Sequence, residues 1–318
     1  MFKETRKRSL RKSIGWRVVA FSNSWLILTL GLTDTLFDNL MVGGNQLLPF
    51  FKYKNFNFIK GDIRNLKELK ESVKGNDIIV HLAALVGFPV CKMNPDLAKE
   101  TNVQGTINLI KACDKNQIIF YGSTGSNYGA VTDICTESTP LHPLSLYGET
   151  KTKAEKLLMK RGNTIAYRFA TAFGVSPRLR LDLLINDFTY KCIKDGYLVV
   201  YEKNYMRTFI HVSDITECFV FGIKNIDKMV DNVFNVGNDS MNHSKEDVCD
   251  MIGKKTGAFI HYAEIGEDAD KRNYVVSYDK IKKLGFETKI TVETGIDEVI
   301  RALKVTEFKN QYSNAKYY

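Results

Sequence analysis

The chain has 318 residues, of which 44% are hydrophobic and 25% are charged, and this balance excludes a disordered or low-complexity protein. The net charge is +9, but residues 1–12 carry +5 of it as a basic tail, so the body is too mildly charged to indicate nucleic-acid binding. Six scattered cysteines without a Cys-x-x-Cys pair argue against a zinc site and a disulfide framework, and they are typical of a reducing cytoplasm.

An apolar stretch at residues 16–37 follows the basic tail and resembles a signal anchor. Polar residues such as Ser22, Asn23 and Asp34 interrupt it. Because a membrane-spanning helix needs about 20 predominantly apolar residues, we expect no membrane insertion. We therefore expect a cytoplasmic protein with a solvated N-terminal tail.

From residue 56 onward, short apolar runs alternate with helical patterns. The runs predict strands at residues 57–61, 77–83, 117–122 and 164–169, and helices at residues 66–74, 96–115 and 145–161. Such an alternation indicates a parallel sheet covered by helices on both faces. After Gly174 the pattern becomes less regular, which indicates a smaller substrate-binding part. Ligands of parallel sheets bind at the carboxyl ends of the strands, so polar residues just after each strand are candidates.

Tyr147 and Lys151 form a Tyr-x-x-x-Lys pair at the start of a predicted helix. Positions i and i+4 share one face of a helix, so the ammonium can lie close to the phenol. A nearby cation lowers the pKa of a phenol from its ordinary value of about 10, which would let Tyr147 exchange a proton with a substrate hydroxyl. Thr124 follows the strand at 117–122, where its hydroxyl could bond the same substrate oxygen.

The spacing alone is weakly specific, because three other pairs share it and are more simply interpreted as surface contacts: Tyr190/Lys194, Tyr278/Lys282 and Tyr312/Lys316. Seven further segments add context: GDIRN (61–65), HLAA (81–84), NVQGT (102–106), GSTGSNYG (122–129), YGETK (147–151), YRFATAFG (167–174) and RTFIHVSDI (207–215). They occur in the order seen in extended short-chain dehydrogenases/reductases. The chain resembles the branch that contains UDP-glucose 4-epimerase and dTDP-glucose 4,6-dehydratase, from about residue 35 to about residue 300.

The resemblance implies a fold of class α/β, with a Rossmann-like doubly wound parallel sheet and a smaller C-terminal substrate-binding domain. Residues 1–175 would form the NAD-binding domain, in which residues 1–34 are atypical. Residues 176–318 would mainly bind substrate, with residues 205–240 returning to the Rossmann part. The cofactor implied is NAD, and the implied cofactor-binding residues are Asp38, Asn39, Asp62, Ile63, Leu82, Ala83, Ala84, Tyr147 and Lys151.

The catalytic residues implied by the resemblance are Thr124, Tyr147 and Lys151. The substrate implied is a nucleoside-diphosphate sugar, contacted by Thr124, Ser126, Asn186, Arg207 and Arg272. No metal, nucleic acid or membrane is expected as a partner, and the resemblance implies a homodimer. Simpler roles stay open: Asp38 and Asp62 could end strands in turns, Arg207 and Arg272 could form surface ion pairs, and His81 and His211 are better interpreted as structural.

The reaction that the resemblance favours is 4-epimerisation through a transient 4-keto sugar. The 4,6-dehydratases carry an Asp-Glu pair directly after the catalytic threonine, whereas Gly125 and Ser126 follow Thr124 here. A 4,6-dehydratase, decarboxylase or reductase of the same family stays an alternative. A non-catalytic remnant with impaired cofactor binding is the alternative from a different class.

The glycine loop of this family, GxxGxxG, is missing from the sequence. Counted back from Asp38, it should fall near residues 14–21, where IGWRVVAF offers only Gly15. Backbone amides of that loop and the following helix normally hold the cofactor pyrophosphate. The loss is abrupt, which suggests a reading-frame disruption or a replaced start. The coding DNA tests this hypothesis, because a frameshift requires an alternative upstream frame that encodes the loop.

Overall fold

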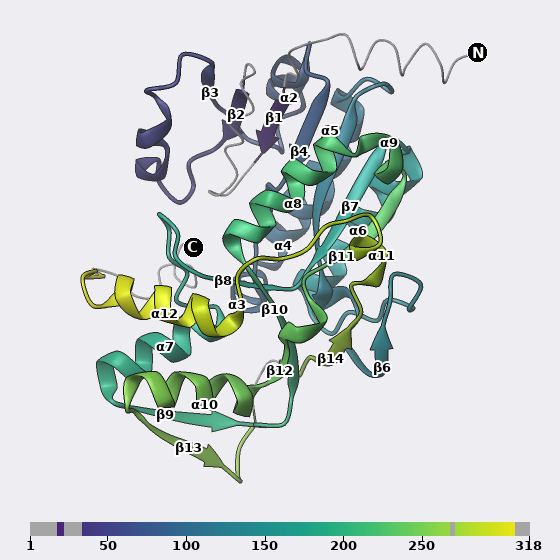
Figure 1. The fold of residues 1–318 in the computed structure, drawn as a ribbon. Coiled ribbons are helices and arrows are strands. Elements are labelled where there is room, and N and C mark those ends of the chain that lie inside the picture. The colour runs from purple at the N-terminus through teal and green to yellow at the C-terminus, as the bar shows by residue number, and fades with distance from the viewer. Residues whose placement is uncertain (1–17, 22–33, 268–270, 309–318) are drawn as a thin grey trace.

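The structure is a computed structural model that describes residues 18–21, 34–267 and 271–308. Its larger part is a seven-stranded sheet in which every neighbouring pair is parallel (Figure 1). This confirms the predicted α/β class with a doubly wound sheet, because the chain moves outward from the central strand in both directions. In spatial order the strands are β11 (Asn232–Val236), β7 (Thr164–Phe169), β5 (Ile118–Thr124), β4 (Ile78–His81), β1 (Val18–Phe21), β2 (Asp34–Asp38) and β3 (Phe56–Lys60).

Helices cover both faces of this sheet, and alternate residues of each strand pack against opposite layers. In β5, Ile119 and Tyr121 join the core beneath three packed helices, α2 (Leu66–Val73), α5 (Gly105–Ala112) and α6 (Leu146–Arg161). Ile118 and Phe120 join the core on the other face, together with residues of α8 (Val212–Lys224). Burial on both faces explains why β4 and β5 read as continuous apolar runs.

The predicted elements from residue 56 to residue 169 are confirmed, with small differences at their ends. The strand predicted at 117–122 continues to Thr124, so the candidate hydroxyl lies on the last residue of β5. The single helix predicted at 96–115 is instead three pieces: α4 (Pro95–Lys99), a π-helical turn at Glu100–Gln104 (η2), and α5. π-Helical turns inside helices are often found at functional sites.

The expected loop position near residues 14–21 is wrong for its last four residues, which form the central strand β1 between β2 and β4. A loop after this strand would fall in residues 22–33, outside the described residues, and Gly31 is the single glycine in that segment. The stretch at 16–37 thus contributes strands β1 and β2 at its two ends. Within the described ranges, none of the helices combines the length and hydropathy needed to cross a membrane.

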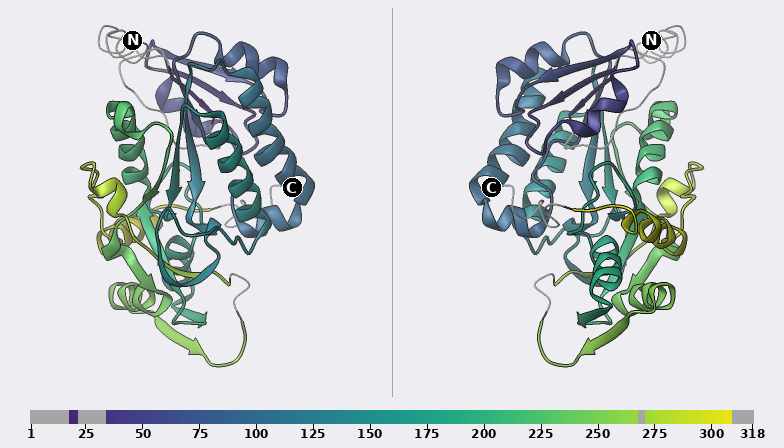
Figure 2. Two further views of the ribbon diagram at one scale, coloured as in Figure 1. Left: turned by 90° about the vertical axis from the view of Figure 1, so that its right-hand side faces the viewer. Right: turned by 90° about the vertical axis from the view of Figure 1, so that its left-hand side faces the viewer.

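A smaller unit lies below the carboxyl ends of the sheet (Figure 2). It has its own apolar core, built by α7 (Leu184–Asp195), α10 (Lys245–Thr256), α12 (Val292–Leu303) and the parallel pair β9 (Tyr197–Tyr201) and β13 (Phe259–Ala263). Two short sheets connect this unit to the larger one. They are formed by β8 (Thr171–Phe173), β10 (Met206–His211) and β12 (Asn242–Ser244), and by β6 (Ala130–Cys135) and β14 (Asn273–Val276).

The remaining described elements are short connectors between these layers. The helices among them are α3 (Phe88–Met93), α9 (Ile226–Met229) and α11 (Asp279–Lys282). The 3₁₀ turns are η1 (Asn45–Phe50), η3 (Gly125–Asn127) and η4 (Asp239–Met241). Of these, α3 and η3 follow the carboxyl ends of β4 and β5, where the candidate site lies.

Candidate active site

The first turn of α6 brings Tyr147 to the end of β5. Ser145 caps the helix by accepting a hydrogen bond from the Gly148 amide (3.2 Å), and this side-chain cap fixes where the helix begins. A Cβ on Gly148 would lie 3.0 Å from the Ser126 carbonyl oxygen and 2.8 Å from the Pro143 Cβ. Glycine is therefore required for α6 to approach the turn after β5 so closely.

Thr124, Tyr147 and Lys151 meet at this point. The Thr124 hydroxyl shares a hydrogen bond with the Tyr147 phenol, and it also lies 3.1 Å from the Ser126 Oγ. Lys151 is 3% exposed, and its ammonium lies 4.2 Å from the centre of the Tyr121 ring, a cation–π contact beneath the sheet surface. The hydroxyl, phenol and ammonium predicted from the sequence therefore lie in one cluster at the carboxyl end of the sheet.

The expected lowering of the Tyr147 pKa is wrong for this structure. Burial raises the pKa of Tyr147 to about 12, and the hydrogen bond to Thr124 offsets only part of that rise. Burial also lowers the pKa of Lys151 to about 7, although the nearby Glu155 carboxylate acts in the opposite direction. Loss of water is the largest cause of both pKa shifts, because burial disfavours the charged form of each group.

A buried polar network lies behind this cluster. Arg168 of β7 pairs with Glu155, one turn after Lys151 on α6, through its Nη2 at 2.6 Å, and both side chains are almost completely buried. The same carboxylate accepts hydrogen bonds from the Ser123 Oγ (2.6 Å) and the Asn127 Nδ2 (3.2 Å). These contacts fasten α6, which carries Tyr147 and Lys151, to β5 and β7.

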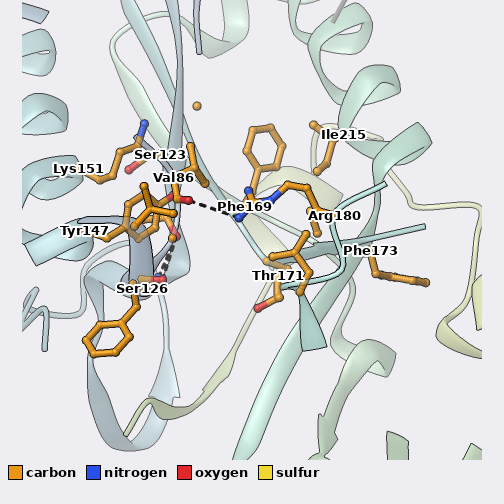
Figure 3. Close-up of a pocket in the computed structure, with 18 of the residues that line it drawn as sticks. Val86, Ser123, Ser126, Tyr147, Lys151, Phe169, Thr171, Phe173, Arg180 and Ile215 are labelled. Atoms are coloured by element: carbon orange, nitrogen blue, oxygen red, sulfur yellow. Dashed lines mark hydrogen bonds between the residues drawn. The ribbon is translucent and has the colours of Figure 1, made fainter. Parts of the chain in front are cut away.

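A cavity of about 560 Å³ opens in front of the cluster, between the sheet and the smaller unit. In Figure 3, Tyr147, Lys151 and Ser126 lie on one side of it, and Arg180 reaches from the other side to the Val86 carbonyl oxygen (3.3 Å). Among the described residues that line the cavity there is no carboxylate, whereas five are cationic. The cations are Lys151, Arg178, Arg180, Lys271 and Arg272.

The predicted substrate residues are brought together only in part. Ser126, Asn186 and Arg272 line the cavity, and Arg272 donates to the Ser126 Oγ at 2.6 Å. Asn186 is buried, where it accepts from the Gly174 amide (3.2 Å) and donates to the Arg180 carbonyl (3.1 Å). Arg207 is outside the described cavity lining, and its guanidinium donates to the Arg272 carbonyl. Arg207 thus supports the segment that carries Arg272.

The predicted cofactor residues border a second, smaller hollow at the ends of β2, β3 and β4. Asp38, Asn39, Ile63, Ala83 and Ala84 line it. Asp62 lies beside it, where it accepts from the Asn39 Nδ2 at 3.2 Å, and Leu82 lines the main cavity instead. Burial raises the pKa of Asp38 to about 6, although the Leu40 amide and the Arg178 guanidinium lower it.

Thr101 is a lining residue of the small hollow that the sequence did not suggest. It belongs to the π-helical turn η2, and its side-chain oxygen is buried without a hydrogen-bond partner among the described residues. A buried hydroxyl without a partner costs free energy, and a group bound in the small hollow would complete its bonding. In the sequence, Thr101 falls inside an ordinary helical pattern, and only the unwound turn distinguishes it.

The two histidines have contacts that suit structural roles. His81 Nε2 lies 2.9 Å from the Thr106 hydroxyl, and burial lowers the pKa of His81 to about 3. His211 caps α8 through its Nδ1, and its Nε2 lies 2.8 Å from a Glu298 carboxylate oxygen. Neither ring is part of the described lining of the two hollows.

Comparison with known proteins places this site in a family. Protein CapI of Staphylococcus aureus is 27% identical over 278 residues, which cover 78% of this chain and 82% of that protein. CDP-paratose 2-epimerase of Salmonella typhi is 25% identical over 317 residues, which cover 86% of this chain and 92% of that protein. The solved structure of UDP-glucuronic acid 4-epimerase from Bacillus cereus has the same fold, with a TM-score of 0.80 at 20% identity. The match covers 91% of this chain and 99% of that chain.

The model of the NAD-dependent epimerase/dehydratase family matches residues 30–237, which is more than half of the chain. The match spans β2 to β11 and therefore includes Thr124, Tyr147, Lys151 and the small hollow. The chain belongs to the NAD-dependent epimerase/dehydratase family of enzymes.

Proposed function

We propose that the protein is a nucleotide-sugar 4-epimerase that uses NAD. The observation that carries this proposal is the composition of the main cavity: Thr124, Tyr147 and Lys151 converge on it, and its described lining holds cations but no carboxylate. A cationic cavity suits the diphosphate of a nucleotide sugar, because guanidinium groups pair well with phosphate oxygens. The hydroxyl and phenol supply the proton-handling groups that a sugar hydroxyl needs.

The described residues fit NAD at both of its ends. Asp38, at the carboxyl end of β2, lines the small hollow with Ala83 and can accept hydrogen bonds from ribose hydroxyls. Thr101 adds a buried hydroxyl without a described partner on the same wall. At the other end, Leu82 and Lys151 border the main cavity, where a nicotinamide ring and its ribose would lie. NAD, when bound, supplies hydride acceptance and return.

The protein's own side chains would transfer the proton and orient the sugar. Tyr147 would hold the proton of the C4 hydroxyl, and Thr124 would bond the same oxygen. The pKa of about 12 for Tyr147 must fall before proton removal is efficient near neutral pH. Arg180 and Arg272 already lower it, a protonated Lys151 would lower it further, and the buried Glu155 carboxylate favours that protonated form. Arg272 and Ser126 would orient the diphosphate at the mouth of the cavity.

The dehydratase alternative lacks its acid and base at this site. Elimination of water from the sugar needs a proton donor and a proton acceptor beyond the Tyr147 phenol. Gly125 and Ser126 stand directly after Thr124, and Ser126 is engaged with Arg272. Since no described lining residue is a carboxylate, the cavity suits epimerisation better than elimination.

The test is a screen of nucleotide sugars with NAD, in which NMR determines the configuration at C4. We expect interconversion of C4 epimers, and a 10²- to 10⁴-fold lower kcat for Tyr147→Phe, the range for loss of a general acid–base. Tyr190→Phe is the matched control, because Tyr190 also belongs to a Tyr-x-x-x-Lys pair but packs against Phe308. A 4-keto-6-deoxy product, released CO₂ or net NADH consumption would identify another reaction of the family.

A non-catalytic remnant gives a different result in the same screen. It would bind nucleotide sugars without binding NAD and would convert none of them. The family resemblance also leads us to propose a homodimer in the cytoplasm. Light scattering on the purified protein measures the mass of the assembly directly and tests the dimer.

A further inference from the structure

Ser126 links Arg272 to the threonine of the catalytic cluster. It is 3% exposed, and its Oγ accepts a hydrogen bond from the Arg272 Nη1 at 2.6 Å. The same oxygen accepts a second hydrogen bond, which the Thr124 hydroxyl donates at 3.1 Å. A hydrogen bond from a cation is shorter and stronger than one between neutral groups, so Arg272 fixes the Ser126 oxygen as an acceptor.

The single hydrogen of the Thr124 hydroxyl is therefore committed. A hydroxyl has one hydrogen to donate and two lone pairs that accept. Thr124 donates its hydrogen to Ser126, and it accepts a hydrogen bond from the Ser126 backbone amide at 3.2 Å, which closes the turn η3. Only a lone pair is left for the bond that Thr124 shares with the Tyr147 phenol. In this arrangement Tyr147 is the donor and keeps its proton.

The direction of this hydrogen bond decides which form of Tyr147 it favours. A hydrogen that Thr124 donated to the phenolate would stabilise the charged form and lower the pKa of Tyr147. While Ser126 holds that hydrogen, Thr124 can only accept, and it favours the protonated phenol instead. The same count leaves Thr124 no hydrogen for the oxygen of a sugar. A change of partner at Ser126 is thus needed before Thr124 can support the base form of Tyr147.

We propose that Ser126 is a positioning residue for the proton step: it takes the hydrogen of Thr124 and thereby keeps Tyr147 in the proton-donating form. This inference rests on the proposed role of Tyr147 in exchanging the sugar proton. For the base form in the ligand-free protein, the Thr124–Ser126 hydrogen bond breaks, the Thr124 hydroxyl turns to the Tyr147 oxygen, and the phenol proton passes to solvent. Arg272 holds the acceptor in place, so the segment before β14 also affects this step.

Other charged or titratable groups face the phenol from the elements around it, and a Ser126 variant leaves their charges as they are. These groups are Cys91 of α3, Tyr121 of β5, Lys151 of α6, Arg180 between β8 and α7, and Arg272 before β14. Burial is the largest cause of the raised pKa of Tyr147, and the two arginines lower it. An effect of Ser126 that requires the Thr124 hydroxyl is separable from all of them.

The experiment follows the ionisation of Tyr147 in the ligand-free protein by ¹³C NMR of the tyrosine Cζ, with the signal assigned from the Tyr147→Phe protein. We expect Ser126→Ala to raise the ratio of phenolate to phenol at Tyr147 about 10- to 100-fold at one fixed pH, the range for a hydrogen bond to a charged group. Ser126→Thr should match the wild type, because it keeps the accepting oxygen. Ser176→Ala is the matched control, since this serine lines the same cavity and donates to the Arg178 carbonyl at 3.1 Å.

The double variant Ser126→Ala/Thr124→Val separates the proposal from a simple gain of water around the phenol. We expect no rise in the phenolate ratio relative to Thr124→Val, because the hydrogen that Ser126→Ala would free is absent. An equal rise in both backgrounds would overturn the proposal, as would an unchanged ratio in Ser126→Ala or the same rise in Ser126→Thr. The titration uses neither NAD nor a sugar, so its failure is distinguishable from a failure of the proposed epimerase reaction, which the nucleotide-sugar screen tests.

Discussion

Removal of Arg168 is expected to destabilise the protein by about 3–5 kcal/mol, the cost of leaving one charge of a buried ion pair without its partner. Its side chain is 6% exposed and that of Glu155 is 3% exposed, so water cannot replace the lost contacts. Arg168 donates three of the hydrogen bonds to this carboxylate, at 2.6, 3.2 and 3.2 Å. The remaining donors, Ser123 and Asn127, are neutral and cannot balance the charge.

The change to measure is Arg168→Met, which keeps the bulk of the side chain and removes its charge. Urea unfolding followed by far-UV circular dichroism should show a midpoint lower by about 1–2 M, if m is about 3 kcal/mol per M. The double variant Arg168→Met/Glu155→Leu should recover much of the loss, because it removes the stranded carboxylate as well. Lys255→Ala is the control, since it breaks a pair with Asp297 that is partly open to water and should cost no more than about 1 kcal/mol.

The reasoning fails if Arg168→Met costs less than about 1 kcal/mol, because the carboxylate would then be compensated without the guanidinium. It also fails if the double variant is no more stable than the single one. In that case the loss would come from packing rather than from the stranded charge of Glu155.

Three further predictions concern single residues. Burial lowers the pKa of Lys151 from 10.5 to about 7, so between these pH values the unfolded chain binds more protons than the folded protein. The free energy of unfolding should therefore rise with pH in this range. Lys151→Met should remove this rise when urea midpoints are compared at about pH 7 and about pH 9. Thr101→Val should raise the free energy of unfolding of the ligand-free protein by about 1 kcal/mol in urea unfolding. The same change should weaken the binding of adenosine about 2- to 10-fold, as measured by calorimetry. Gly61→Ala should lower the unfolding free energy by about 1–3 kcal/mol, because its Cβ would lie 2.4 Å from the Phe37 ring.

The central sheet could be predicted because its strands are buried on both faces. The first four residues of β5 (IIFY) read as an apolar run, and Gly162, with a φ of 79°, ends α6 where the sequence indicated. The position of β1 could not be obtained this way. Counting back from Asp38 assumes the usual spacing between the first two strands, whereas only residues 22–33 separate β1 from β2.

The candidate site was predictable where one segment carries the chemistry. Tyr147 and Lys151 share one helix, and Thr124 ends the neighbouring strand, so their meeting follows from the topology. The direction of the Tyr147 pKa was not predictable, because it depends on how much water the fold excludes. Arg178 and Thr101 reach the cleft from segments with no distinctive motif, and only the folded chain shows what they face.

Titration of the intact protein with NAD tests the account most directly, because every role assigned to Thr124, Tyr147 and Lys151 requires the cofactor beside them. The account predicts saturable binding with one NAD per chain, and weaker binding by Lys151→Met. A folded protein that binds a nucleotide sugar but shows no saturable NAD binding would contradict it.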